Sequence, residues 1–291
     1  DEIESYNDSP SELIYDEFEN AVFSGHPLGH NILGQPSQVR SYTTADALHF
    51  THRHYKPDNA VFFAYGDISF KRLVNMLERA TTDLPTDADG TTPALADAVA
   101  TVGDLPEYRP QTIESHRGTH QAHVMMGNRA YGIHDERRIV LYLLNNILGG
   151  PGMNARLNTS LRERRGLVYT VESTMTSYSD TGVWSVYFGC DQHDVNRCLR
   201  LVRGELDRMM EHTLSDSQLR AAKRQIKGQI CVACDNRENF ALDFGKSFLH
   251  YGWEKDPSAL LRHIDAVTAE SIQQVARETF RKDLMTTLIY V

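Results

Sequence analysis

An internal repeat constrains the fold of this 291-residue chain more than any other feature. The order helix, loop, helix, strand occurs twice, once ending near Tyr65 and once ending near Tyr290. Within it, Thr44-Ala-Asp-Ala-Leu corresponds to Thr268-Ala-Glu-Ser-Ile at the start of the second helix. A single repeat over so long a period indicates a duplicated domain rather than a short-period solenoid.

The two copies differ in completeness. Glu12 and Phe18 fall on Glu238 and Phe244 when the first copy is shifted by 226 positions. Residues 106–236, with several strand and helix patterns, precede this shared section in the second copy, whereas almost nothing precedes it in the first. We therefore expect a truncated first copy and a chain that begins within a domain.

The order of the remaining patterns predicts an α+β fold. Runs of strands mixed with packed helices, without strict βαβ alternation, are typical of a mostly antiparallel sheet covered by helices. We expect helices at 1–23 with a break or new start at Pro10, and at 44–54, 69–82, 136–148, 194–212, 215–235 and 268–280. Thr44 is the expected cap of the helix at 44–54, and Ser215 that of the helix at 215–235. We expect strands at 59–65, 111–116, 121–130, 168–178, 182–190 and 285–291, with 59–65 buried and 168–190 forming a hairpin.

Residues 86–106 have the composition of an exposed linker. Asp, Ala, Thr, Gly and Pro dominate this stretch, and large apolar residues are few. The linker divides the chain into residues 1–85, the C-terminal part of the first domain, and 107–291, the second domain.

Composition excludes some classes of protein. The net charge is −9 and no basic block stands out, so we expect no nucleic-acid partner. No apolar run approaches the length of a membrane span, so we expect no membrane partner. Four cysteines suit a reducing compartment such as the cytoplasm. Cys231 and Cys234 lie within a helical pattern, which favours small buried thiols over half of a zinc knuckle.

The stretch from Gly149 to Tyr169 is the best candidate for a functional site. A glycine turn leads into a short amphipathic segment with Leu157 and Leu161 on one side, which ends at Gly166 and passes into a strand. Arg162 and Tyr169 flank this helix-to-strand corner, and both side chains are good donors to an anionic or carbonyl oxygen. Cations that suit the dipole of a helix end are the alternative.

Several motifs in order resemble the pitrilysin/insulinase family of zinc peptidases, and within it the bacterial relatives of mitochondrial processing peptidase. The motifs are Asp1-Glu-Ile-Glu-Ser-Tyr-Asn-Asp-Ser-Pro10, Gly25-His-Pro-Leu-Gly, Ile32-Leu-Gly34, Asn146-Ile-Leu-Gly-Gly, Arg156-Leu, and Leu161-Arg-Glu-x-x-Gly-Leu-x-Tyr169. The resemblance implies two similar metallohydrolase-like domains that close around a peptide. It also implies a zinc ion, held by an inverted His-x-x-Glu-His motif and a distal glutamate.

This sequence contains no His-x-x-Glu-His motif. His134-Asp-Glu136 and the cluster of His49, His52 and His54 do not have its spacing. We therefore expect zinc in the intact protein, where it would acidify a water molecule, and none bound to this chain, which should be inactive alone.

The resemblance assigns roles to three residues. Glu2 matches the distal zinc ligand, and its counterpart under the repeat shift, Gly228, cannot ligate. The second domain therefore resembles the inactive partner domain of the family, which contributes an arginine and a tyrosine to the cleft. Arg162 and Tyr169 match that pair and would hold the substrate backbone and stabilise the oxyanion.

Other prominent side chains are expected to be structural. His26 and His30 belong to a turn pattern, and Trp184, Tyr187 and Phe188 alternate along a strand as core and sheet-face residues do.

Two functional hypotheses remain. The first is a zinc endopeptidase that cleaves peptides held extended, with the missing N-terminal half of the same protein supplying the histidines. The second is a non-catalytic structural or substrate-binding subunit of a processing-peptidase-like complex. A homodimer or a pair of active and inactive subunits is compatible with either hypothesis, and the choice between processing and degradation stays open.

Overall fold

The computed structural model describes residues 2–84, 105–252 and 256–291. These residues form two compact units, which are described separately. Unit 1 comprises the described residues of Asp1–Gln35, Asp104–Gly228 and Ala259–Val291, and unit 2 comprises those of Pro36–Gly103 and Gln229–Ser258. The domains expected from the sequence, 1–85 and 107–291, correspond to the two repeat copies and not to these two units. They stay a prediction. Residues 86–104 of the expected linker lie outside the described residues.

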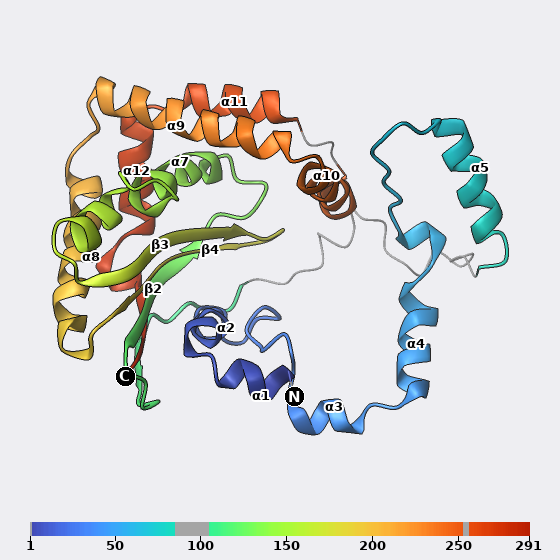
Figure 1. The fold of residues 1–291 in the computed structure, drawn as a ribbon, viewed down its shortest axis with the longest axis horizontal. Helices are drawn as coiled ribbons and strands as arrows, with labels where there is room; N and C mark the ends of the chain where they lie inside the picture. Colours follow the sequence, from blue (N-terminus) through green and yellow to red (C-terminus); the bar gives the residue numbers. More distant parts are fainter. Residues whose placement is uncertain (1, 85–104, 253–255) are drawn as a thin grey trace. The chain divides into compact units, whose positions relative to one another are not determined.

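Unit 1 is built on a five-stranded mixed sheet in the order β1-β5-β2-β4-β3 (Figure 1). Strand β1 pairs with β5 in parallel, and the other three pairings are antiparallel. The strands are β1 (Thr112–Ser115), β2 (Ala122–Ala130), β3 (Val168–Ser177), β4 (Gly182–Cys190) and β5 (Thr286–Tyr290). The expected α+β class, with a mostly antiparallel sheet packed against helices, is confirmed, as is the hairpin of β3 and β4.

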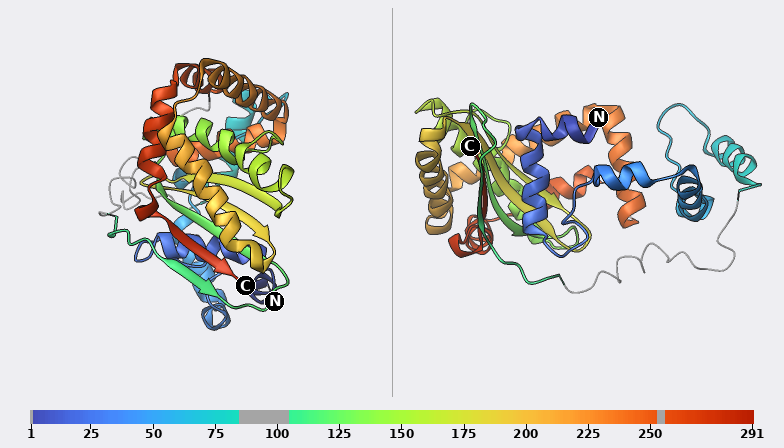
Figure 2. Two further views of the ribbon diagram at one scale, coloured as in Figure 1. Left: turned by 90° about the vertical axis from the view of Figure 1, so that its left-hand side faces the viewer. Right: turned by 90° about the horizontal axis from the view of Figure 1, so that it is seen from below.

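Helices cover both faces of this sheet (Figure 2). On one face, α7 (Arg137–Gly149) contacts β3 and α12 (Ala269–Thr279) contacts β2, with α8 (Val195–Glu211) packed on α12. On the other face, α2 (Pro10–Val22, blue) lies on β2 and β5.

The double cover explains why all nine residues of β4 are buried. Successive side chains of a strand point to opposite faces. Val183 and Tyr187 accordingly join the apolar cluster under α2, whereas the Trp184 ring centroid lies 4.3 Å from that of Phe280 at the end of α12. The expected core roles of Trp184, Tyr187 and Phe188 are confirmed.

The remaining elements of unit 1 are shorter or continue into unit 2. Helix α9 (Asp216–Asp235) begins in unit 1 and is capped as predicted by Ser215, whose hydroxyl accepts the Gln218 N–H at 3.3 Å. The expected start of a new helix at Pro10 is also confirmed. The others are α1 (Glu2–Asn7), α11 (Pro257–Ala266) and the short turns η2 (Asn158–Glu163), η3 (Gln192–Asp194) and η4 (Lys282–Leu284).

The described residues of unit 2 form no comparable core. Its elements are α3 (Pro36–Ser41), α4 (Thr44–His54), η1 (Pro57–Asn59), α5 (Phe70–Thr81) and α10 (Arg237–Tyr251). None of the described residues between 36 and 84 is buried. The expected buried strand at 59–65 is wrong: Asn59 ends η1, and the residues that follow pair with no strand among the described residues. A strand needs a ladder partner for its backbone groups, and unit 2 offers none there.

The repeat is visible in the helix caps. Thr43, rather than the expected Thr44, caps α4, and its hydroxyl accepts the Asp46 N–H at 3.3 Å. Thr268 caps α12 in the same way with Ser271, 225 positions further on. The short turns η1 and η4 are separated by the same 225 positions. The two copies therefore share their local structure, with the sequence match at Thr44 corrected by one residue.

All four cysteines are free thiols. Cys190 and Cys198 are buried, whereas Cys231 is exposed on α9 and Cys234 is partly exposed. The expected burial is therefore wrong for Cys231, because the C-terminal part of α9 belongs to the open unit 2. Among the described residues, no helix combines the length and apolar composition needed to cross a bilayer.

Candidate functional site

The candidate site begins at the glycine corner after α7. The Gly150 N–H bonds the Asn146 carbonyl at 3.2 Å and closes the helix. A Cβ atom added to Gly149 would lie 2.5 Å from the backbone nitrogen of Ser173 in β3. Only glycine allows this close approach of the helix end to the strand. The predicted glycine turn thus anchors the corner against the sheet.

Arg162 lies on a turn of π-helix, η2, that the sequence did not reveal. Leu157 and Leu161 are fully buried, as predicted from their spacing, and the Arg164 N–H bonds the Thr159 carbonyl at 3.2 Å, five residues back. Gly166, three residues after the end of η2, has a φ of 60°, a left-handed conformation suited to glycine. Single π-turns of this kind occur frequently at functional sites.

The arginines on this turn differ in how they are engaged. The Arg165 guanidinium donates to the Ser160 carbonyl at 2.6 Å. The side chains of Arg162 and Arg164 are exposed and form no hydrogen bond or ion pair with any described residue. A guanidinium held at a helix end without a carboxylate partner is available to an anionic or carbonyl oxygen.

Tyr169 lies on a β-bulge at the start of β3. Val168 pairs with Cys190 and Thr170 with Gly189, so Tyr169 is an extra residue on the β3 side of the ladder. Its side chain is 71% exposed, and its hydroxyl has no partner among the described residues. Bulges re-aim side chains and are over-represented beside active sites. The two predicted donors, Arg162 and Tyr169, therefore flank one corner, and neither side chain has a hydrogen-bond partner among the described residues.

Strand β3 is also an edge of the sheet, because β4 is its single neighbour in the strand order. Near its middle, Glu172 accepts a hydrogen bond from the Tyr15 hydroxyl of α2. Burial, and then the charge of Glu172, raise the pKa of Tyr187 on β4 to about 12, so that phenol stays protonated. Beyond these contacts the outer edge of β3 pairs with no described strand.

Glu2 comes from a separate element. It is exposed in the first turn of α1 and has no hydrogen-bond or ion-pair partner among the described residues. No histidine of the described chain joins it in a ligand set. Glu2 alone does not fit a zinc ion, which in proteins takes three or four N, O or S ligands.

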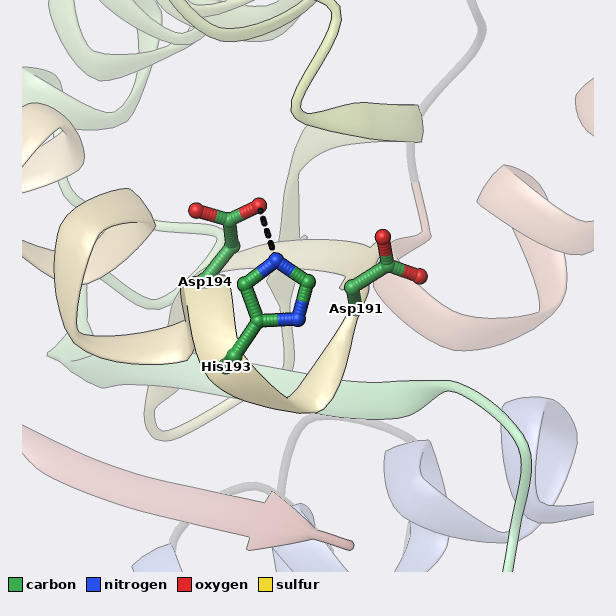
Figure 3. A group of neighbouring side chains, drawn as sticks. All are labelled: Asp191, His193 and Asp194. Carbon is green, nitrogen blue, oxygen red and sulfur yellow. Dashed lines mark ion pairs between the residues drawn. The ribbon is translucent and has the colours of Figure 1, made fainter.

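One other group has the donor types of a metal site, and the sequence reasoning missed it. Asp191, His193 and Asp194 surround η3, and their ligand atoms lie within 4.8 Å of one another (Figure 3). His193 Nε2 lies 3.4 Å from Asp194 Oδ2, and an Arg197 guanidinium nitrogen lies 3.7 Å from the other carboxylate oxygen. Asp191 and His193 are exposed, and Asp194 already has the Arg197 guanidinium as a neighbour, so we do not assign a metal to this group.

His26 is structural, as expected. Its Nε2 lies 3.1 Å from an Asp180 carboxylate oxygen, and the Leu28 N–H donates to its Nδ1 at 3.2 Å. The imidazole therefore joins the loop after α2 to the turn between β3 and β4.

Comparison with known proteins identifies the family. Residues 41–226 match the family described as "Peptidase M16 inactive domain". This match covers more than half of the chain, which therefore belongs to the peptidase M16 family and carries its inactive domain. The expected resemblance to the pitrilysin/insulinase zinc peptidases is confirmed.

Related sequences support the same assignment. The chain is 31% identical over 278 residues to an uncharacterized zinc protease of Streptomyces coelicolor, covering 96% of this chain and 60% of that protein. It is 27% identical over 289 residues to an uncharacterized zinc protease of Bacillus subtilis, covering 99% of this chain and 68% of that protein. The chain thus spans about two thirds of the length of these relatives.

Solved structures share the fold. The crystal structure of a peptidase M16 inactive domain from Pseudomonas fluorescens superposes with a TM-score of 0.81 at 20% identity, covering 99% of this chain and 67% of that one. A protease from Helicobacter pylori gives a TM-score of 0.83 at 18% identity, covering 98% and 68%.

Proposed function

We propose that this chain is part of a zinc-dependent endopeptidase that holds a peptide extended between two similar domains. In this proposal the inactive domain supplies Arg162 and Tyr169 to the substrate. The observation that carries it is the geometry of one corner. Two exposed donors flank it, one on a π-turn and one on a β-bulge, at the beginning of a sheet edge that pairs with no described strand, and neither side chain has a partner among the described residues.

The free edge of β3 would bind the peptide backbone. An unpaired strand edge presents alternating N–H and C=O groups, to which an extended segment can add as a further strand. Such pairing forms hydrogen bonds with the peptide backbone and does not depend on the peptide side chains. It suits an enzyme that must position many different sequences in one extended form.

Arg162 and Tyr169 would then bind carbonyl oxygens of the bound peptide. The guanidinium brings a positive charge with directed N–H donors, and the phenol brings one neutral O–H donor. Donors that are already in place are most effective where negative charge develops, as on the scissile carbonyl oxygen during attack by water.

Zinc enters this proposal only through the longer protein. Glu2 is proposed there as the distal ligand, with two imidazoles from a part of the protein outside this chain. When bound, the metal would activate the attacking water. Because Glu2 alone does not form a zinc site, the chain by itself should not hydrolyse peptides.

The test uses the longer protein and a fluorogenic peptide. Arg162→Ala and Tyr169→Phe should each lower kcat by on the order of 10² or more, the usual effect of removing one oxyanion donor. Arg164→Ala is the matched control and should keep the wild-type rate, because Arg164 lies two residues away and its side chain is also exposed, with no partner among the described residues. Wild-type kcat in either of the first two variants would overturn the proposed roles.

A second candidate function is a non-catalytic substrate-binding or structural subunit. The free edge of β3 and the two donors, present here without a zinc ligand set, would suffice to bind a peptide without cutting it. The partner would then be an active subunit, or a second copy. The two candidates differ in the upstream half of the gene product. A His-x-x-Glu-His motif there supports the peptidase, and its absence supports the binding subunit.

A further inference from the structure

The side chain of Arg165 binds the backbone of the turn that carries Arg162. Its Nη1 donates to the Ser160 carbonyl at 2.6 Å and lies 3.4 Å from the Ser160 hydroxyl oxygen. Ser160 is buried, although Arg165 itself is exposed. A hydrogen bond from a guanidinium to a carbonyl is charge-assisted and stronger than one between two neutral groups. The Arg165 side chain therefore closes a loop over the turn, from the residue that follows it back into its middle.

This bond completes a series of hydrogen bonds to successive carbonyls of η2. The Thr159 carbonyl accepts the Arg164 N–H at 3.2 Å. The Leu161 carbonyl accepts the Leu167 N–H at 3.0 Å. The Ser160 carbonyl lies between these two and receives the guanidinium donor. A buried carbonyl that loses its donor costs more free energy than an ordinary hydrogen bond contributes. Loss of this side chain would therefore favour a different winding of the turn.

Arg162 lies within the loop that this bond closes. Its own carbonyl accepts the Gly166 N–H at 2.8 Å. Leu157 and Leu161 hold one side of the turn in the core. The Arg162 guanidinium, by contrast, has no hydrogen-bond or ion-pair partner among the described residues. Because no such partner fixes this side chain, its direction depends on the backbone that carries it.

Arg164 provides a matched contrast to Arg165. Its side chain is exposed and has no partner in the part of the chain that the structure describes. Its contribution to the turn is the backbone N–H that bonds Thr159, which alanine supplies equally well. Substitution of Arg164 therefore removes one positive charge from this corner without removing a side-chain hydrogen bond.

We propose that Arg165 is a positioning residue for Arg162. Its guanidinium holds the turn in the π-helical winding that aims the Arg162 guanidinium at the bound peptide, without contacting the peptide itself. The inference rests on the proposed function, because it takes Arg162 as the donor to the substrate. A misplacement of about 1 Å at a reacting centre can cost on the order of 10² in rate, so one hydrogen bond in the turn can decide the activity.

The first experiment measures hydrolysis of the fluorogenic peptide by the longer protein. Arg165→Ala should lower kcat by on the order of tenfold, less than the loss of Arg162 itself, and should change KM less than kcat. Arg165→Lys should recover most of this loss, because an ammonium group can still donate to the Ser160 carbonyl. Arg164→Ala should keep the wild-type kcat. Wild-type kcat in Arg165→Ala would overturn the proposal.

A double-mutant cycle shows whether Arg165 acts through Arg162. In the Arg162→Ala background, Arg165→Ala should lower kcat no further, because no guanidinium is left to position. A purely structural role, such as a contribution to overall stability, would give the same loss in both backgrounds. An equal loss in the two backgrounds would therefore overturn the proposal.

The second experiment tests the turn without catalysis, by NMR-detected hydrogen exchange on the 291-residue chain. Protection of the Gly166 and Leu167 amides should fall by on the order of tenfold in Arg165→Ala and stay unchanged in Arg164→Ala. Unchanged protection in Arg165→Ala would overturn the proposal. If Arg162→Ala keeps the wild-type kcat, the proposed function is wrong, and the exchange result still decides whether Arg165 holds the turn.

Discussion

Units 1 and 2 contain the same repeated elements in opposite states of burial. Helix α12 buries Ile272, Val275 and Ala276, whereas the corresponding helix α4 buries no residue. Strand β5 lies between β1 and β2, whereas its counterpart at 60–65 pairs with no strand among the described residues. Sequence and capping suffice to form a helix in either unit. A core, by contrast, requires a sheet, which is assembled from distant segments.

The largest expected contrast is between a buried aromatic residue of unit 1 and an exposed one of unit 2. Trp184→Ala should lower the free energy of unfolding by about 3–5 kcal/mol, because the ring is fully buried against Phe280. Phe62→Ala in unit 2, where Phe62 is 53% exposed, should change it by less than about 0.5 kcal/mol. Urea denaturation measures both. Equal losses would show that unit 2 hides a core of its own.

The glycine corner provides the next contrast. Gly149→Ala should cost about 1–3 kcal/mol, because the added methyl group meets the backbone and side chain of Ser173. Gly204→Ala in α8, where an added Cβ contacts nothing within 4 Å, should instead stabilise by about 0.5–1 kcal/mol. Thermal unfolding of the two variants shows whether the close approach of Gly149 to β3 requires a residue without a side chain. A neutral Gly149→Ala would contradict the anchoring of this corner on β3.

The two repeated capping boxes sharpen the comparison further. Thr268→Ala should lower the global unfolding free energy by about 1 kcal/mol, because α12 is part of the unit 1 core. Thr43→Ala removes the corresponding cap hydrogen bond from α4, yet we expect faster amide exchange confined to that helix and no global change. A global loss of similar size in both variants would mean that α4 unfolds together with unit 1.

The smallest effect concerns pH. Burial lowers the pKa of His123, whose Nδ1 lies 2.8 Å from the Tyr187 hydroxyl, below its ordinary value of 6.5. The unfolded chain therefore binds the proton more readily, so this contribution to stability is complete above pH 6.5 and declines as pH falls below it. Unfolding free energies at pH 7.5 and 5.5 should differ less in His123→Gln than in the wild type. An unchanged difference would exclude His123 as the cause.

Local signals in the sequence predicted most elements of unit 1. The spacing of apolar residues located α7, α8 and β4, and Ser215 and Thr268 marked the starts of α9 and α12. The expected strand at 59–65 failed because β-branched and aromatic residues indicate strand propensity without supplying a partner. The packing of α2 on β5 was also beyond reach, since it joins residues that lie far apart in the chain.

The sequence predicts which residues belong to the candidate site, but not the backbone geometry that positions them. Spacing and resemblance single out Arg162 and Tyr169, and both side chains are exposed, with no partner among the residues that the structure describes. Their roles stay a proposal, as does that of Glu2. The π-turn and the bulge have no local sequence signature beyond Gly166, because each depends on how a neighbouring strand or helix accommodates one extra residue.

The bulge at Tyr169 has a consequence for anything that pairs with β3. Two residues of β3 oppose one of β4 there, so the alternation of side chains along β3 changes phase at that point. An added strand that ran past it in a single register would turn its side chains to the wrong face on one side of the bulge. The bulge thus fixes the register of an added strand. The register in turn decides which side chains of that strand face the helices that cover the sheet.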